Sequence, residues 1–189
     1  MMGAVLMNDW GTTDEKAMRS YRAAMSNGQG RMHEMLIEGG CRYYLANKRA
    51  HVIKTPEPFR VISKNAQGIA KVQFTAHAEP DFIGSLNGGS LIAFEAKFTN
   101  TARIQQSVVT KTQAESLTAH QRLGAYTCVC VGIQSEAFMV PWKVFRNMSQ
   151  NFGHKYATAD DIRPWQVNND SVVKFLDYVD QSISIMEVG

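Results

Sequence analysis

The sequence predicts an α/β protein with a mixed central β-sheet flanked by helices. Segments with helical periodicity lie towards both ends of the chain, and apolar, strand-like runs lie between them. Its 189 residues, 44% hydrophobic and 20% charged, suit one domain with a sizeable core. The composition therefore excludes a globally disordered chain.

The net charge of +3 permits a polyanionic partner without requiring one. The three cysteines, Cys41, Cys128 and Cys130, form an odd set without Cys-Xaa-Xaa-Cys spacing, and the last two lie in an apolar run. We expect them to be core residues of a protein in the reducing cytoplasm. An apolar signal core and a membrane-length apolar stretch are lacking, so we expect no membrane partner.

Two helices are expected in the first quarter of the chain. Residues 12–15, Thr-Thr-Asp-Glu, predict the start of a short helix that runs to about Met25. Asn-Gly-Gln-Gly at 27–30 is expected to break it, and a second helix is expected over 31–47. We therefore divide the chain into an N-terminal extension, residues 1–26, and a single domain, residues 27–189.

A basic arm is expected next, at about 54–77. After a strand at 52–54, the prolines of Thr-Pro-Glu-Pro force an extended course. The following segment carries Arg60, Lys64 and Lys71 and ends at Phe74. It is interpreted either as an arm that contacts phosphates and stacks Phe74 on a base, or as an edge hairpin with Phe74 in the core.

The chemistry is expected in a hairpin over residues 79–98. Asp81 opens an apolar run, Asn-Gly-Gly at 87–89 supplies a turn, and the returning strand carries Glu-Ala-Lys at 95–97. Strand alternation puts Glu95 and Lys97 on one face. If the hairpin brings Asp81 opposite, the two carboxylates suit a divalent cation, and the ammonium can orient water and offset phosphate charge. The alternative is a solvated strand with an ion pair.

The remainder completes the expected order of elements. A polar loop, mobile and DNA-facing or simply solvated, is expected over 99–113, and Thr118 to Gln121 has capping-box spacing for a short helix ending near Gly124. The other expectations are strands at 126–133 and 137–140, a helix starting at 141–145, a loop-rich segment at 146–170 and a closing helix at 171–185.

Several blocks in this order resemble one known family. They are Gly30, Glu34 and Tyr43-Tyr44-Leu45; Val52 to Pro58; Phe74; Glu95-Ala96-Lys97; His120-Gln121; and residues 153–162. Over most of residues 28–180 the sequence resembles the RecU family of Holliday-junction resolvases, part of the restriction-endonuclease-like superfamily with the Pro-Asp…(Asp/Glu)-Xaa-Lys signature.

The resemblance implies a restriction-endonuclease-like fold, a homodimer, Mg²⁺ or Mn²⁺ without an organic cofactor, and symmetric nicking of four-way DNA junctions in recombination and repair. It implies that Asp81 and Glu95 hold metal, that Lys97 assists the attacking water, and that Glu34 completes or supports the site, with Gln121 auxiliary. The residues expected to contact DNA are Arg31, Lys54, Arg60, Lys64, Lys71, Phe74, Arg103 and Lys111.

Two departures from the family pattern bear on DNA selectivity. Glu79-Pro80 stands where the family usually has a Ser/Thr-Thr pair, and the loop after Lys97 is longer than usual. Two alternatives remain open: a nuclease of the same superfamily that acts on duplex, branched or single-stranded DNA, and a junction-binding structural protein without catalysis.

Overall fold

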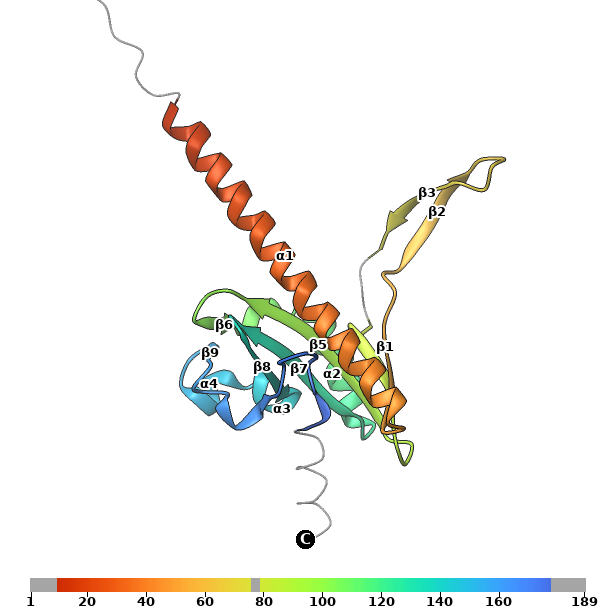
Figure 1. Ribbon diagram of the computed structural model, residues 1–189, viewed down its shortest axis with the longest axis vertical. Coiled ribbons are helices and arrows are strands. Elements are labelled where there is room, and N and C mark those ends of the chain that lie inside the picture. Colours follow the sequence, from red (N-terminus) through yellow and green to blue (C-terminus); the bar gives the residue numbers. More distant parts are fainter. Residues whose placement is uncertain (1–9, 76–78, 178–189) are drawn as a thin grey trace, which may run out of the picture.

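A six-stranded mixed sheet forms the centre of the molecule, with a long helix on one face and shorter helices on the other (Figure 1). The computed structural model describes residues 10–75 and 79–177. The expected α/β class, with a mixed central sheet flanked by helices, is confirmed. Within the described residues, no helix combines the length and the apolar character needed to cross a membrane.

The helices are α1 (Trp10–Ala46), α2 (Lys111–Arg122), α3 (Trp142–Phe145) and α4 (Met148–Phe152), with 3₁₀ turns η1 (Gln106–Val108) and η2 (Arg163–Trp165). The strands are β1 (Ala50–Lys54), β2 (Phe59–Lys64), β3 (Ala70–Phe74), β4 (Phe82–Leu86), β5 (Leu91–Thr99), β6 (Arg103–Gln105), β7 (Tyr126–Ile133), β8 (Glu136–Pro141), β9 (Tyr156–Thr158) and β10 (Gln166–Val167). The chain leaves the main sheet after β1 to form the β2–β3 pair, after β5 to form β6 and α2, and after β8 to form α3, α4 and β9.

The main sheet has the order β1-β4-β5-β7-β8-β10. Only the central pair β5–β7 is parallel; the other neighbours are antiparallel. This pair is joined through α2, which crosses one face, as parallel strands need a long connection. At Gly84 in β4 an added Cβ would lie 2.1 Å from the carbonyl oxygen of His51, so the β1–β4 approach requires glycine.

The two faces of the sheet carry separate cores, because successive strand residues point to opposite sides. In β7, Cys128 and Cys130 pack with α1 residues such as Tyr44, whereas Val129 and Val131 pack with α2 and α3. The two β7 cysteines are buried as expected, and burial raises the pKa of the Cys128 thiol to about 12. A strand buried on both faces fixes the position of its neighbour β5.

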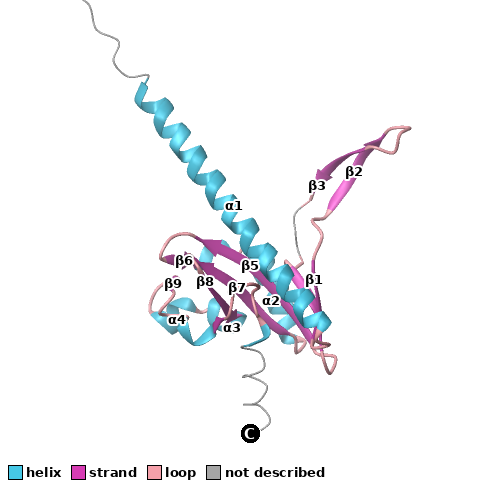
Figure 2. Cartoon of the chain, viewed as in Figure 1, coloured by secondary structure: helices cyan, strands magenta, loops and turns pink. Residues whose placement is uncertain are grey.

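Strands β2 and β3 form a two-stranded sheet of their own, which projects from the body (Figure 2). Every side chain of β2 is exposed. The expected projecting arm at about 54–77 is therefore confirmed, and the alternative of an edge hairpin on the main sheet is wrong. Residues 76–78 and the side chain of Phe74 lie outside the described part, so its stacking role stays a prediction.

Helix α1 corrects the expected break at residues 27–30. The helix is continuous from Trp10 to Ala46, and its N-terminal half extends away from the sheet (Figure 1). A glycine inside a helix costs about 1 kcal/mol, whereas starting a new helix costs a nucleation step. An added Cβ at Gly28 or Gly30 would meet no atom within 4 Å, so neither glycine is needed for close packing.

Two later expectations are also wrong in detail. Residues 99–113 are not a loop: they contain β6, paired with β9, then η1 and the start of α2. The capping box is formed by Thr110 and Gln113 instead of the expected Thr118 and Gln121, so α2 begins at Lys111.

The expected closing helix over 171–185 does not begin at 171. Residues 171–175 are not helical; Val173 instead donates its backbone N–H to the carbonyl of Leu36, 3.0 Å away, and packs in the α1-side core. A hydrogen bond to α1 holds this segment, so tertiary contact overrides its helical pattern. Residues from 178 onward lie outside the described part.

Candidate active site

Asp81 stands at the entry to β4, where the β4–β5 hairpin places it beside the middle of β5. Phe82 pairs with Phe94, so Asp81 faces the next positions of β5. The backbone N–H of Ala96 donates to Asp81 Oδ2 at 2.9 Å. That hydrogen bond fixes the carboxylate against the strand.

Glu95 and Lys97 share one face of β5 and converge with Asp81. Lys97 Nζ lies 2.8 Å from Glu95 Oε2 and 3.3 Å from Asp81 Oδ2. The Glu95 side chain is fully buried, while Lys97 and Asp81 keep 17% and 27% exposure. The structure thus brings together the three residues that the sequence placed on facing strands of one hairpin. We call Asp81, Glu95 and Lys97 the Asp81 group.

Burial and charge oppose one another in the Asp81 group. Burial raises the pKa of Glu95 to about 7, the charge of Asp81 adds to the rise, and Lys97 partly offsets it. Burial lowers the pKa of Lys97, but the charges of Asp81 and Glu95 outweigh this, so its pKa is raised overall. Lys97 is therefore a cation at neutral pH.

The donor set fits a hard divalent cation. Glu95 Oε1 is buried and accepts no hydrogen bond, a costly arrangement that a cation would relieve. Across residues 10–75 and 79–177 no three His, Cys, Asp or Glu side chains gather as a metal-ligand cluster. Two carboxylates suffice for Mg²⁺, because it commonly takes one or two carboxylates and completes its shell with water and substrate phosphate.

Glu34 lies on α1, and its side chain lies near Asp81. It lines a hollow of about 230 Å³ together with Asp81 and Lys54. Lys54 Nζ lies 2.7 Å from Glu34 Oε2 and 3.6 Å from Glu38 Oε1. The hydrogen bond that Lys54 donates to Glu34 is the main cause that raises the pKa of Lys54. Glu34 thus neighbours Asp81 while paired with a lysine.

The last turn of α2 approaches Glu79, in the non-strand segment that leads into Asp81. His120 Nε2 lies 3.8 Å from Glu79 Oε2, so the acidic residue that departs from the family pattern is near the His-Gln pair. Gln121 follows on the same turn, and its side chain is partly exposed.

Sequence reasoning missed Thr55. Its backbone N–H donates to the carbonyl of Asp81 at 2.8 Å, and its hydroxyl donates to the carbonyl of Pro80 at 2.6 Å. These hydrogen bonds hold Pro80 and Asp81 to the base of the projecting hairpin. The sequence offered one indication of this role: Thr55 has a hydroxyl group and directly follows the strand that ends at Lys54.

The other residues expected to contact DNA are spread along the molecule. Arg60, Lys64 and Lys71 lie exposed on the β2–β3 hairpin, where Arg60 is hydrogen-bonded to Gln73 Oε1. Three more residues that were expected to contact DNA are also exposed: Arg31 on α1, Arg103 on β6 and Lys111 at the start of α2.

A family model described as Recombination protein U, RecU, matches residues 28–181. The chain belongs to the RecU family. The RecU match contains the whole Asp81 group, Glu34 and the β2–β3 hairpin, and it begins within α1.

Comparison with proteins outside the family model adds little. No curated protein matches the RecU chain in sequence. Among solved structures it is similar to Hjc from Archaeoglobus fulgidus, a Holliday junction resolvase from an archaeal hyperthermophile, with 12% identity and a TM-score of 0.45. That similarity covers 75% of this chain and 97% of the Hjc chain.

Proposed function

We propose that this RecU-family resolvase is a metal-dependent endonuclease that makes symmetric, paired nicks in four-way DNA junctions during recombination and repair. The observation that carries the proposal is the Asp81 group: two carboxylates and an ammonium, hydrogen-bonded together on adjacent strands within the RecU match. This set of groups suits phosphodiester hydrolysis, because negative charge develops on the phosphoryl oxygens and cations held there stabilise it.

Asp81 and Glu95 are the residues that would hold the cation, Mg²⁺ or Mn²⁺. When bound, such an ion neutralises phosphoryl charge and lowers the pKa of a water nucleophile. Ala96 contributes by fixing Asp81 through its backbone N–H. The buried environment of Glu95 excludes water from one side of the site.

Lys97 acts in this proposal as a fixed positive charge. Its raised pKa keeps it protonated at neutral pH, so it can donate hydrogen bonds to the attacking water and to a phosphoryl oxygen rather than remove a proton. Glu34 and Lys54, in the adjoining hollow, are placed to support the site from α1, and Gln121 from α2.

The β2–β3 hairpin and the other exposed basic residues supply DNA contacts in this proposal. Phosphate contacts make binding strongly dependent on salt. A junction presents two equivalent strands, so a two-fold homodimer is the matching arrangement. Residues 1–26 form an N-terminal extension in this proposal, and residues 27–189 a single nuclease domain.

Strand-resolved cleavage of a mobile four-way junction, with Mg²⁺ or Mn²⁺, tests the proposal. Wild type should produce paired symmetric nicks, and Asp81→Asn should reduce the rate at least about 100-fold while junction affinity is retained. A linear duplex of the same sequence is the matched control. Light scattering with and without junction measures the expected dimer.

Each outcome separates one alternative. Equal cutting of duplex and junction would keep the metal site and remove the junction specificity. Binding without cleavage by wild type, under all metals tried, would favour a structural junction-binding protein. Unchanged cleavage by Asp81→Asn would remove Asp81 from the mechanism.

A further inference from the structure

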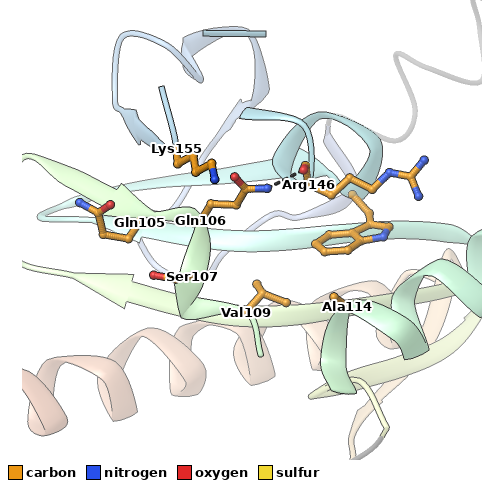
Figure 3. A pocket seen from close by; sticks show the side chains of 8 residues that line it. Gln105, Gln106, Ser107, Val109, Ala114, Arg146 and Lys155 are labelled. Carbon is orange, nitrogen blue, oxygen red and sulfur yellow. Dashed lines mark hydrogen bonds between the residues drawn. The ribbon is translucent and has the colours of Figure 1, made fainter. Parts of the chain in front are cut away.

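A second hollow lies towards the N-terminal end of α2, away from the Asp81 group. Its volume is about 660 Å³. Figure 3 shows the side chains that line it. Its polar lining consists of Gln105, Gln106, Ser107, Arg146 and Lys155. None of the proposed roles above uses Gln105, Gln106, Ser107, Arg146 or Lys155.

Three segments that are distant in sequence build this hollow. The backbone N–H of Gln106 donates to the carbonyl of Lys155 at 3.0 Å, next to the β6–β9 pairing. The side-chain amide of Gln106 donates to the backbone carbonyl of Arg146, as Figure 3 shows. Val109, Ala114 and Trp142 form its apolar part. Both interactions use Gln106 and set the two basic residues beside it.

Among the described residues that line the hollow, the two charged side chains, Arg146 and Lys155, are both basic. Arg146 and Lys155 are exposed, and within residues 10–75 and 79–177 neither forms an ion pair. Arginine, lysine, glutamine and serine are the side chains that contact DNA phosphates and sugars. Together these features suit a phosphodiester backbone.

Neighbouring residues extend the basic surface. Arg103 on β6 lies over the ring of Tyr156, 4.8 Å from its centroid, and Tyr156 pairs with Gln105 across the β6–β9 ladder. Arg103 thus adds a cation to the β6–β9 ladder that also carries Gln105. A surface of this kind can follow a strand rather than hold a single ion.

We propose that this hollow binds the sugar–phosphate backbone of a junction arm, as a contact separate from the site of cleavage; the inference rests on the proposed function. Ala114, near the start of α2, lines the hollow, and His120, in the last turn of α2, lies 3.8 Å from Glu79. The step of six residues between these two positions rises about 9 Å along the helix. The hollow is therefore separated from the segment that leads into Asp81.

Salt-dependent junction binding tests the hollow directly. Arg146→Gln with Lys155→Gln, in the Asp81→Asn protein to prevent cleavage, should lower junction affinity about 10-fold and reduce the slope of log affinity against log salt by about two. The matched control is Lys143→Gln with Lys48→Gln, two exposed lysines outside the hollow. An unchanged slope, or a loss equal to the control, would overturn the proposal.

Modified DNA tests the contact in a second way. Neutral methylphosphonate linkages, placed one at a time along a junction arm, should weaken binding by the protein that keeps Arg146 and Lys155 at one or more positions, and should have no further effect there on the double variant. Equal losses in both proteins at every position would overturn the proposal. Inorganic phosphate distinguishes a site for free anions. Phosphate is first titrated without DNA to find the saturating concentration, and DNA affinity is then measured at that concentration. If saturating phosphate leaves DNA affinity unchanged, the proposal would also be overturned.

The test remains informative if the proposed function fails. Duplex DNA reports the same salt slope whether or not the wild-type protein cleaves a junction. Conversely, normal cleavage of saturated junction by Arg146→Gln with Lys155→Gln, together with an unchanged slope, would leave the nuclease in place and remove only the hollow.

Discussion

The Asp81 group and the β2–β3 hairpin differ in how the rest of the molecule holds them. Glu95 is fully buried on β5, a strand paired on both sides in the main sheet. Every β2 side chain is exposed, and among the described strands β2 pairs only with β3. The Asp81 group therefore lies where the fold allows little movement, whereas the hairpin is joined to the body through its two ends.

This difference predicts which substitutions affect which property. Buried, hydrogen-bonded groups are positioned by many neighbours, so changing one alters reaction geometry. Exposed side chains away from such contacts usually change stability by less than about 0.5 kcal/mol, so the hairpin can carry DNA contacts at little structural cost. Thr55 joins the two regions, because it bonds the turn that holds Asp81.

The largest effect is expected in the body, from Lys97→Met. The variant keeps the side-chain length and removes the charge, so the single-turnover cleavage rate should fall at least about 100-fold with junction affinity nearly unchanged. Lys143→Met, on an exposed lysine outside the site, is the control. A similar fall in rate for both variants would show that the position of Lys97 in the Asp81 group does not matter for cleavage.

A smaller effect is expected in the hairpin, from Lys64→Gln with Lys71→Gln. Loss of two phosphate contacts should weaken junction binding about 10-fold and lower the salt slope by about two, with the rate at saturation unchanged. The unfolding temperature should stay close to that of wild type, since both side chains are exposed. Filter binding over a salt series and thermal unfolding measure these quantities. A fall in the saturated rate would mean that the hairpin also positions the reacting strand.

The smallest effect is expected from His33, which is buried in the body beneath β7. Burial lowers its pKa, which the contact with the Cys130 carbonyl and the charge of Glu34 only partly oppose. The unfolded chain therefore takes up a proton first as pH falls below about 6.5, and stability falls with a limiting slope of about 1.4 kcal/mol per pH unit.

Urea unfolding at pH 8 and pH 5.5 measures this loss. His33→Gln retains a donor for the Cys130 carbonyl but cannot titrate, so its stability should change less between the two pH values. Equal pH dependence in both proteins would assign the effect to other groups.

Sequence alone determined the hairpin that carries the Asp81 group. Gly88 and Gly89 adopt positive φ angles of 90° and 88°, which glycine reaches without strain, and strand alternation then sets Glu95 and Lys97 on one face. Asp81 and Glu95 are near in the chain, so their meeting depends on one turn and one register. The projecting arm was predictable for a similar local reason, because prolines interrupt the strand pattern before it.

Only the tertiary structure decided the contacts between distant segments. Helix α1 continues through Gly28 and Gly30, Glu34 pairs with Lys54, and Gln106 brings Arg146 and Lys155 to one hollow. Local propensities differ by about 1 kcal/mol or less per residue, which packing and long-range hydrogen bonds easily exceed. Local sequence therefore determined that the carboxylates and the ammonium of the Asp81 group lie together, whereas the tertiary fold determined which residues surround them.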